Sequence, residues 1–71
     1  MPRVEAAFLR AAATHDSAAA MHDQAAELFD ALGKEELAFG ERKRASADRN
    51  RGAADRERAR LRREWITAHP A

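Results

Sequence analysis

The sequence predicts an all-α fold in which two long helices pack as an antiparallel hairpin. Three observations predict it. Residues 4–32 contain neither glycine nor proline, Gly33 interrupts the helix-forming run near its middle, and side chains of one kind recur every seven residues on both sides of that glycine. Seven residues are about two helical turns, so each such ladder lies along one face of a helix.

The first helix is predicted over residues 3–32. Nearly all of its residues are strong helix formers, and Val4 and Thr14 are its only β-branched positions. Gly33 suits the C-terminal cap of this helix. We expect one apolar ladder, widened by Ala7, Met21 and Leu28, to face the second helix, with Phe8, His15, His22 and Phe29 running beside it. That ladder consists of Val4, Ala11, Ala18, Ala25 and Leu32.

The second helix is predicted over residues 35–68, because Glu35 and Glu36 favour the positive end of the helix dipole and Pro70 ends the helix. Gly40 and Gly52 each cost about 1 kcal/mol against alanine in a helix interior. We therefore expect both glycines to mark close helix packing. Each belongs to a ladder of mostly small residues, one of Ala38, Ala45, Gly52, Ala59 and Ile66, the other of Gly40, Ala47, Ala54, Leu61 and Ala68.

A polar seam is predicted between the helices, because two histidines repeat at seven residues in the first and three carboxylates do so in the second. The short connection at Gly33 places His22 near Asp48 and His15 near Asp55. The 3.5-residue period implies left-handed supercoiling, as in a coiled coil. We interpret the seam as structural, with imidazoles donating to carboxylates. Its members are His15, His22, Glu41, Asp48 and Asp55.

The same residues raise a weaker alternative, a metal-responsive or pH-responsive helical bundle. His15 and His22 lie about 10 Å apart along the helix axis, so they cannot share one ion within a chain. No metal ligands are therefore assigned, and no cofactor is expected.

Arginine ladders in the second helix suggest a different function, nucleic-acid binding. Residues 42–63 carry ten basic and three acidic side chains. A stripe of this kind can follow nucleic-acid phosphates, although interleaved aromatic residues and a recognisable DNA-binding motif are missing. In the structural alternative, Arg44, Arg51 and Arg58 pair with nearby acids and the other ladder forms a solvated face. The candidate phosphate contacts are Arg42, Arg49, Arg56 and Arg63.

Size and composition predict self-association of a single helical-hairpin domain, residues 1–71. The chain has no cysteine, and 19 of its residues are alanine, so the isolated hairpin should be marginally stable. A hairpin covers only one of the two small-residue ladders of the second helix. A homodimeric four-helix bundle is the simplest closed assembly that covers both.

Catalysis is not expected, because the sequence contains no nucleophile elbow, phosphate-binding loop or thiol. No apolar run approaches the roughly 20 residues of a membrane span, and no secretory signal is evident, so a cytoplasmic location is expected. The sequence thus favours a small interaction or scaffold protein that acts by forming a homodimer or by binding a helical protein partner. Nucleic-acid binding through the arginine-rich helix is the alternative.

Overall fold

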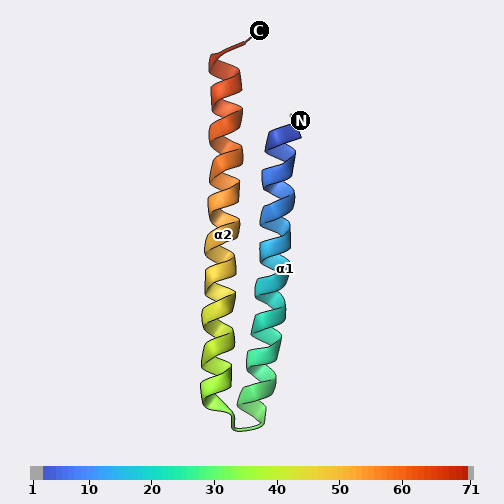
Figure 1. Cartoon of the computed structure of the whole chain (residues 1–71), viewed down its shortest axis with the longest axis vertical. Helices are drawn as coiled ribbons and strands as arrows, with labels where there is room; N and C mark the ends of the chain where they lie inside the picture. Colours follow the sequence, from blue (N-terminus) through green and yellow to red (C-terminus); the bar gives the residue numbers. More distant parts are fainter. Residues whose placement is uncertain (1–2, 71) are drawn as a thin grey trace.

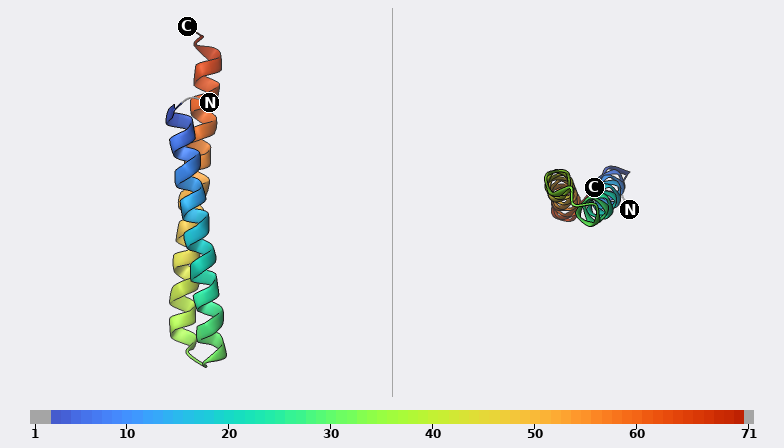
Figure 2. Two further views of the ribbon diagram at one scale, coloured as in Figure 1. Left: turned by 90° about the vertical axis from the view of Figure 1, so that its right-hand side faces the viewer. Right: turned by 90° about the horizontal axis from the view of Figure 1, so that it is seen from below.

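A computed structural model describes residues 3–70 as two helices, α1 (Arg3–Ala31) and α2 (Glu35–Ala68), joined by a tight turn (Figure 1). The predicted all-α antiparallel hairpin and the ranges of both helices are confirmed to within one residue. The helices lie side by side in a single layer, seen edge-on and end-on in Figure 2. Among the described residues, neither helix is long and apolar enough to cross a membrane.

The turn is closed by a glycine cap at the end of α1. Gly33 has φ 73°, a left-handed conformation that glycine adopts without steric cost. Its N–H donates to the Asp30 carbonyl at 3.0 Å, and the Lys34 N–H donates to the Phe29 carbonyl at 2.8 Å. These two bonds form a Schellman motif, which satisfies the last carbonyls of α1 and reverses the chain.

The helices touch along a narrow row of mostly small residues, which we call the alanine seam. In α1 its members are Glu5, Ala12, Ala19 and Ala26. In α2 they are Ala38, Ala45, Gly52 and Ala59. The predicted α2 ladder is therefore the one that faces α1.

The predicted facing ladder of α1 was wrong by one residue. Ala11, Ala18 and Ala25 are only half-buried, and Val4 and Leu32 at its ends are exposed. Ala12, Ala19 and Ala26 form the centre of the contact instead. The histidines lie three positions after the first two of these alanines, on one side of the contact, and an aspartate lies four positions after each of the three, on the other side. Both kinds of polar side chain then reach α2.

The two helical glycines have different surroundings. A Cβ atom at Gly52 would lie 3.0 Å from an Asp16 carboxylate oxygen and 3.4 Å from the Ala12 carbonyl oxygen. A Cβ atom at Gly40 would meet only the flexible Arg44 side chain, at 3.8 Å. Close packing is therefore present at Gly52, whereas at Gly40 the hairpin itself leaves room for a side chain.

The hairpin is a thin rod that measures 58 × 14 × 10 Å. Its radius of gyration is 16.5 Å, against about 11 Å for a compact domain of this length. In the described residues, the buried apolar side chains are all alanines. The fold thus brings two helices together without enclosing a core of large side chains.

The glycine environments predict opposite responses to alanine. We expect Gly40→Ala to stabilise the protein by about 0.5–1 kcal/mol, because it removes backbone freedom from the unfolded chain without a clash. Gly52→Ala should lose that gain to crowding, and Gly52→Leu should destabilise clearly. Thermal unfolding followed by circular dichroism measures all three. Equal stabilisation by both alanine substitutions would contradict the close approach at Gly52.

Candidate functional site

The polar seam is a continuous row in which each histidine lies between two carboxylates. His22 contacts Glu41 through Nδ1 at 2.6 Å and Asp48 through Nε2 at 3.5 Å. His15 contacts Asp48 through Nδ1 at 3.2 Å and Asp55 through Nε2 at 3.7 Å. Asp48 and Asp55 are buried and the other three residues are half-buried. The structure therefore brings all five predicted seam residues together.

The stagger of this row differs in one respect from the sequence expectation. The expected neighbours, His22 with Asp48 and His15 with Asp55, are present. However, each histidine makes its shorter contact with the preceding carboxylate of α2, Glu41 or Asp48. Along the rod, each imidazole lies between two successive carboxylates of α2. Each of its two nitrogens therefore contacts a different carboxylate.

Arginines on α2 complete the seam. Arg44, Arg51 and Arg58 each donate to the carboxylate three residues earlier, at 3.0, 3.5 and 2.9 Å. The expected pairing of this arginine ladder with nearby acids is confirmed. Among the described residues, every buried side-chain nitrogen and oxygen has a hydrogen-bond partner. The seam therefore carries no unsatisfied buried polar group, which would be costly.

The other arginine ladder forms ion pairs between the helices on the opposite side of the alanine seam, which we call the ion-pair side. Arg63 Nε lies 2.6 Å from Glu5 Oε1, and this carboxylate is buried. The remaining pairs join Arg42 to Asp30, Arg49 to Asp23 and Arg56 to Asp16. The expectation that this ladder forms a merely solvated face was wrong, because every one of its guanidiniums meets an acid of α1.

Sequence reasoning missed these pairs, although a signal for them exists. Asp16, Asp23 and Asp30 repeat at seven residues, each directly after His15, His22 or Phe29. A third ladder in α1 with the period of the arginine ladder in α2 predicts pairing across an antiparallel contact. The hydrogen bond from Arg42 to Asp30 is also the main reason why the pKa of the Arg42 guanidinium is raised.

These contacts bear on what the arginines can bind. The guanidiniums of the ion-pair side remain about half exposed, so a phosphate could reach them. Each one already has a carboxylate partner, which a phosphate would have to displace or share. Nearby aspartates would also repel a polyanion.

Metal binding has little geometric basis in the seam. Within residues 3–70, no group of three or more histidine, cysteine, aspartate or glutamate side chains is arranged to hold a metal ion. The two nitrogens of each imidazole contact different carboxylates instead of converging on one point. The seam matches donors with acceptors, and this fixes the axial alignment of the helices.

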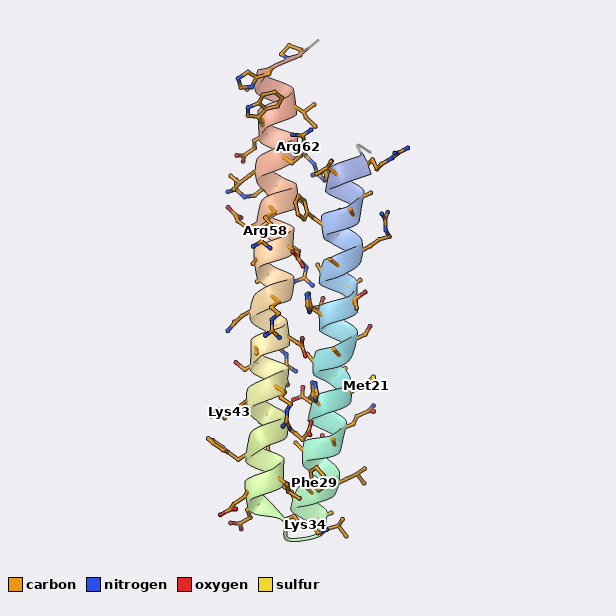
Figure 3. The ribbon with its side chains drawn as sticks, viewed as in Figure 1. Met21, Phe29, Lys34, Lys43, Arg58 and Arg62 are labelled. Atoms are coloured by element: carbon orange, nitrogen blue, oxygen red, sulfur yellow. The ribbon has the colours of Figure 1, made fainter. Side chains whose placement is uncertain are left out.

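A second candidate site is an open apolar groove at the end of the hairpin that carries the termini. It has a volume of about 440 Å³ and is lined by Val4, Phe8, Leu61 and Trp65, with Arg58 and Arg62 beside them. The Arg62 guanidinium lies 5.7 Å from the Trp65 ring centre. Figure 3 shows Arg58 and Arg62 on the upper half of α2, near this end.

Trp65 is held in place by the last turn of α2. Its ring stacks on His69 with a centroid separation of 4.2 Å. The backbone N–H and ring Nδ1 of His69 both donate to the Trp65 carbonyl, at 2.9 and 2.8 Å. The large indole therefore stacks on a neighbouring ring while more than half of its own surface stays exposed.

Neither a family model nor a curated protein nor a solved structure matches this chain. Its surfaces and contacts are therefore the basis for a functional interpretation.

Asp48 is the central group of the polar seam, and its removal should destabilise the fold more than the loss of a surface acid. Asp48→Ala deprives His15, His22 and Arg51 of a shared acceptor, so we expect a loss of about 1–3 kcal/mol in the free energy of unfolding. Glu57→Ala, which removes an exposed carboxylate paired with Arg60, is the matched control. Chemical denaturation measures both, and equal effects would contradict the central role of Asp48.

The ion-pair side predicts rescue by charge exchange. Asp23→Arg and Arg49→Asp should each destabilise by placing like charges across the helices. The double exchange should restore most of the loss, with a coupling of about 0.5 kcal/mol, because both side chains are partly exposed. A double-mutant cycle in low and high salt measures it. Strictly additive effects would show that this pair contributes nothing to the pairing of the helices.

Proposed function

We propose that this protein is a small non-catalytic interaction module that binds a second copy of itself through one face of the hairpin. This apolar face lies on the same flank as the histidines. Its large apolar side chains are Val4, Met21, Leu28, Leu32, Leu37, Leu61 and Trp65. Mostly small residues lie between them on α1 and in the ladder of Leu61, whereas Arg44, Arg51 and Arg58 lie between Leu37 and Trp65.

The observation that supports this proposal is the one-sided distribution of exposed large apolar residues. Eight such side chains are exposed among the described residues, and seven of them belong to the apolar face. The exception is Phe39, which follows a seam alanine directly and so lies on the other flank, where Lys43 contacts its ring. Concentration of exposed apolar surface on one face is typical of interaction sites.

Helix geometry explains why these residues share a face. Val4 directly precedes the seam residue Glu5 on α1, and Leu37 directly precedes Ala38 on α2. Leu32, in the turn, and Trp65, on α2, continue the same seven-residue spacing at the two ends of the hairpin. A residue one step before the seam is rotated about 100° toward the histidine side of the helix. Met21, Leu28 and Leu61 follow a seam residue by two positions and extend this flank outward, as Met21 does in Figure 3, where it points away from α2. The contacts between histidines and carboxylates place the matching flanks of both helices together.

The exposed area is consistent with a missing partner. The chain exposes 5306 Å², whereas a compact folded monomer of its mass exposes about 4,400 Å². The excess of about 900 Å² is close to the roughly 800 Å² that each partner buries in a standard specific interface. A second copy on the apolar face would also supply the core that an alanine seam lacks.

A nucleic-acid-binding function has less support from these contacts. The guanidiniums of Arg42, Arg49, Arg56 and Arg63 already pair with acids of α1. Arg44, Arg51 and Arg58 pair with the carboxylates of the polar seam. The arginines mainly balance charges within the hairpin, so self-association is the function that the geometry favours.

Sedimentation equilibrium tests the proposal. At micromolar concentration we expect a particle of about twice the 7.9 kDa chain mass. Trp65→Glu should weaken association at least tenfold, since it puts a charge into the buried interface. Phe39→Glu is the matched control, because it changes an exposed aromatic residue outside the apolar face and should leave association intact.

The single tryptophan offers an independent reading of the same equilibrium. Its fluorescence emission should shift to shorter wavelength as protein concentration rises and the indole leaves water. A folded protein that stays monomeric at micromolar concentration, with constant emission, would refute self-association.

A further inference from the structure

We infer that the two copies pack with their turns at the same end, related by a two-fold axis parallel to the long axis of the rod, so that α2 of each copy lies against α1 of the other. This inference rests on the proposed self-association through the apolar face. It specifies the partner surface that each helix meets. It follows from the distribution of charge within that face.

Two symmetric arrangements bring the apolar faces into contact. With the axis along the rod, the turns coincide and α2 meets the partner's α1. With the axis perpendicular to the rod and in the plane of contact, the turn of one copy lies over the open end of the other, and each helix meets its own counterpart. Both arrangements bring neighbouring helices antiparallel and bring apolar ends together, so apolar burial alone does not separate them.

The two halves of the apolar face carry different charges. On α1, the ladder from Val4 to Leu32 and the ladder from Ala7 to Leu28 contain only alanine, valine, leucine, methionine and Thr14. On α2, the same flank carries the guanidiniums of Arg44, Arg51 and Arg58, each with about three-fifths of its side chain exposed. The face is thus neutral along α1 and basic along α2.

The arrangement with the turn over the open end would place like charges together. Arg51 lies near the middle of the rod, so it would face Arg51 of the other copy, and Arg44 would face Arg58. Juxtaposed like charges at an interface oppose association. With the turns together, the aliphatic stems of these arginines instead cover the partner's alanine ladder while their charged ends stay with their own carboxylates.

The wider charge pattern agrees with this choice. Residues 1–32 carry two basic and five acidic side chains, and residues 34–71 carry eleven basic and seven acidic ones. Packing α2 against the partner's α1 gives every helix two oppositely charged neighbours. At the open end it also places Trp65 and Leu61 against Val4 and Phe8 of the other copy, which fills the apolar groove.

A spin label on the turn distinguishes the arrangements, and the absence of native cysteine makes it specific. Lys34→Cys places the label on an exposed turn residue, seen at the lower end of Figure 3. With the turns together, the two labels of a dimer should lie within about 30 Å, because neighbouring helix axes are 8–10 Å apart. In the opposite arrangement the distance should approach the 58 Å length of the rod.

Pulsed dipolar spectroscopy measures this distance and separates three outcomes. A short distance supports the inference. A distance near the rod length overturns it and leaves self-association standing. A lack of any intermolecular dipolar signal in a folded sample would refute self-association as well. Asn50→Cys, an exposed position near the middle of α2, is the matched control, because the midpoint of the rod is at the same height in both arrangements.

A charge substitution in the alanine ladder gives a second test that needs no label. Ala18 lies at the height of the Arg51 guanidinium, which is bound to Asp48 between the two histidines. With the turns together, Ala18→Glu should tighten dimerisation about two- to tenfold by meeting Arg51 of the partner copy, and Ala18→Lys should weaken it. In the opposite arrangement two introduced glutamates would face each other, so weakening by both substitutions would overturn the inference.

Discussion

The close approach of two helix axes along the alanine seam is the constraint from which the other features of this hairpin follow. Axis separation depends on the side chains at the contact, and here nothing larger than alanine occupies most of it. Short side chains can therefore cross the gap. Asp16 and Asp23 reach arginines of α2, and imidazoles contact carboxylates directly. Leucines along the seam would separate the axes and put these contacts out of reach.

An alanine seam buries little apolar area and carries little positional information, so the polar seam must define the axial register. Two histidines lie between three carboxylates, and the ladders that contain them end in Phe8 and Phe29 on α1 and in Arg62 on α2. A slip of one heptad would place a phenylalanine between two carboxylates or a histidine beside Arg62. The observed register is the one in which every imidazole has two acceptors. In coiled coils, a buried polar residue can specify the register at a cost in stability, and the polar seam matches that role.

Much of this hairpin could be predicted from the sequence because its information is periodic. The helix ranges, the turn at Gly33 and the five residues of the polar seam all follow from seven-residue spacing and helix-breaking residues. The central ladder of α1 was assigned one position early, because both ladders are rich in alanine and the predicted one ends in the larger apolar residues Val4 and Leu32. In a seam this close, large apolar side chains are excluded, so the usual link between apolar size and burial is reversed.

The ion pairs between the helices were not predicted, because a periodic pattern in one helix does not by itself identify its partner in the other. An arginine ladder in one helix is ambiguous until a matching acidic ladder is recognised in the other, and the seven-residue spacing of Asp16, Asp23 and Asp30 was not used. The groove beside Trp65 was harder to anticipate, because it depends on how far α2 continues along α1 at the open end. Its lining residues come from both ends of the chain.

The two flanks of the hairpin differ in what they leave unsatisfied, and this difference links the fold to its proposed role. On the ion-pair side, the arginines of α2 already pair with acids of α1. A partner would therefore find few unpaired charges on that flank. On the apolar face, the polar groups are also satisfied, but leucines, a methionine and a tryptophan remain in water. Folding of the hairpin thus satisfies its buried polar groups but leaves most of its large apolar side chains exposed to water. Large apolar side chains supply most of the stability of small domains, so the proposed association would add to this hairpin the apolar burial that its alanine seam does not provide.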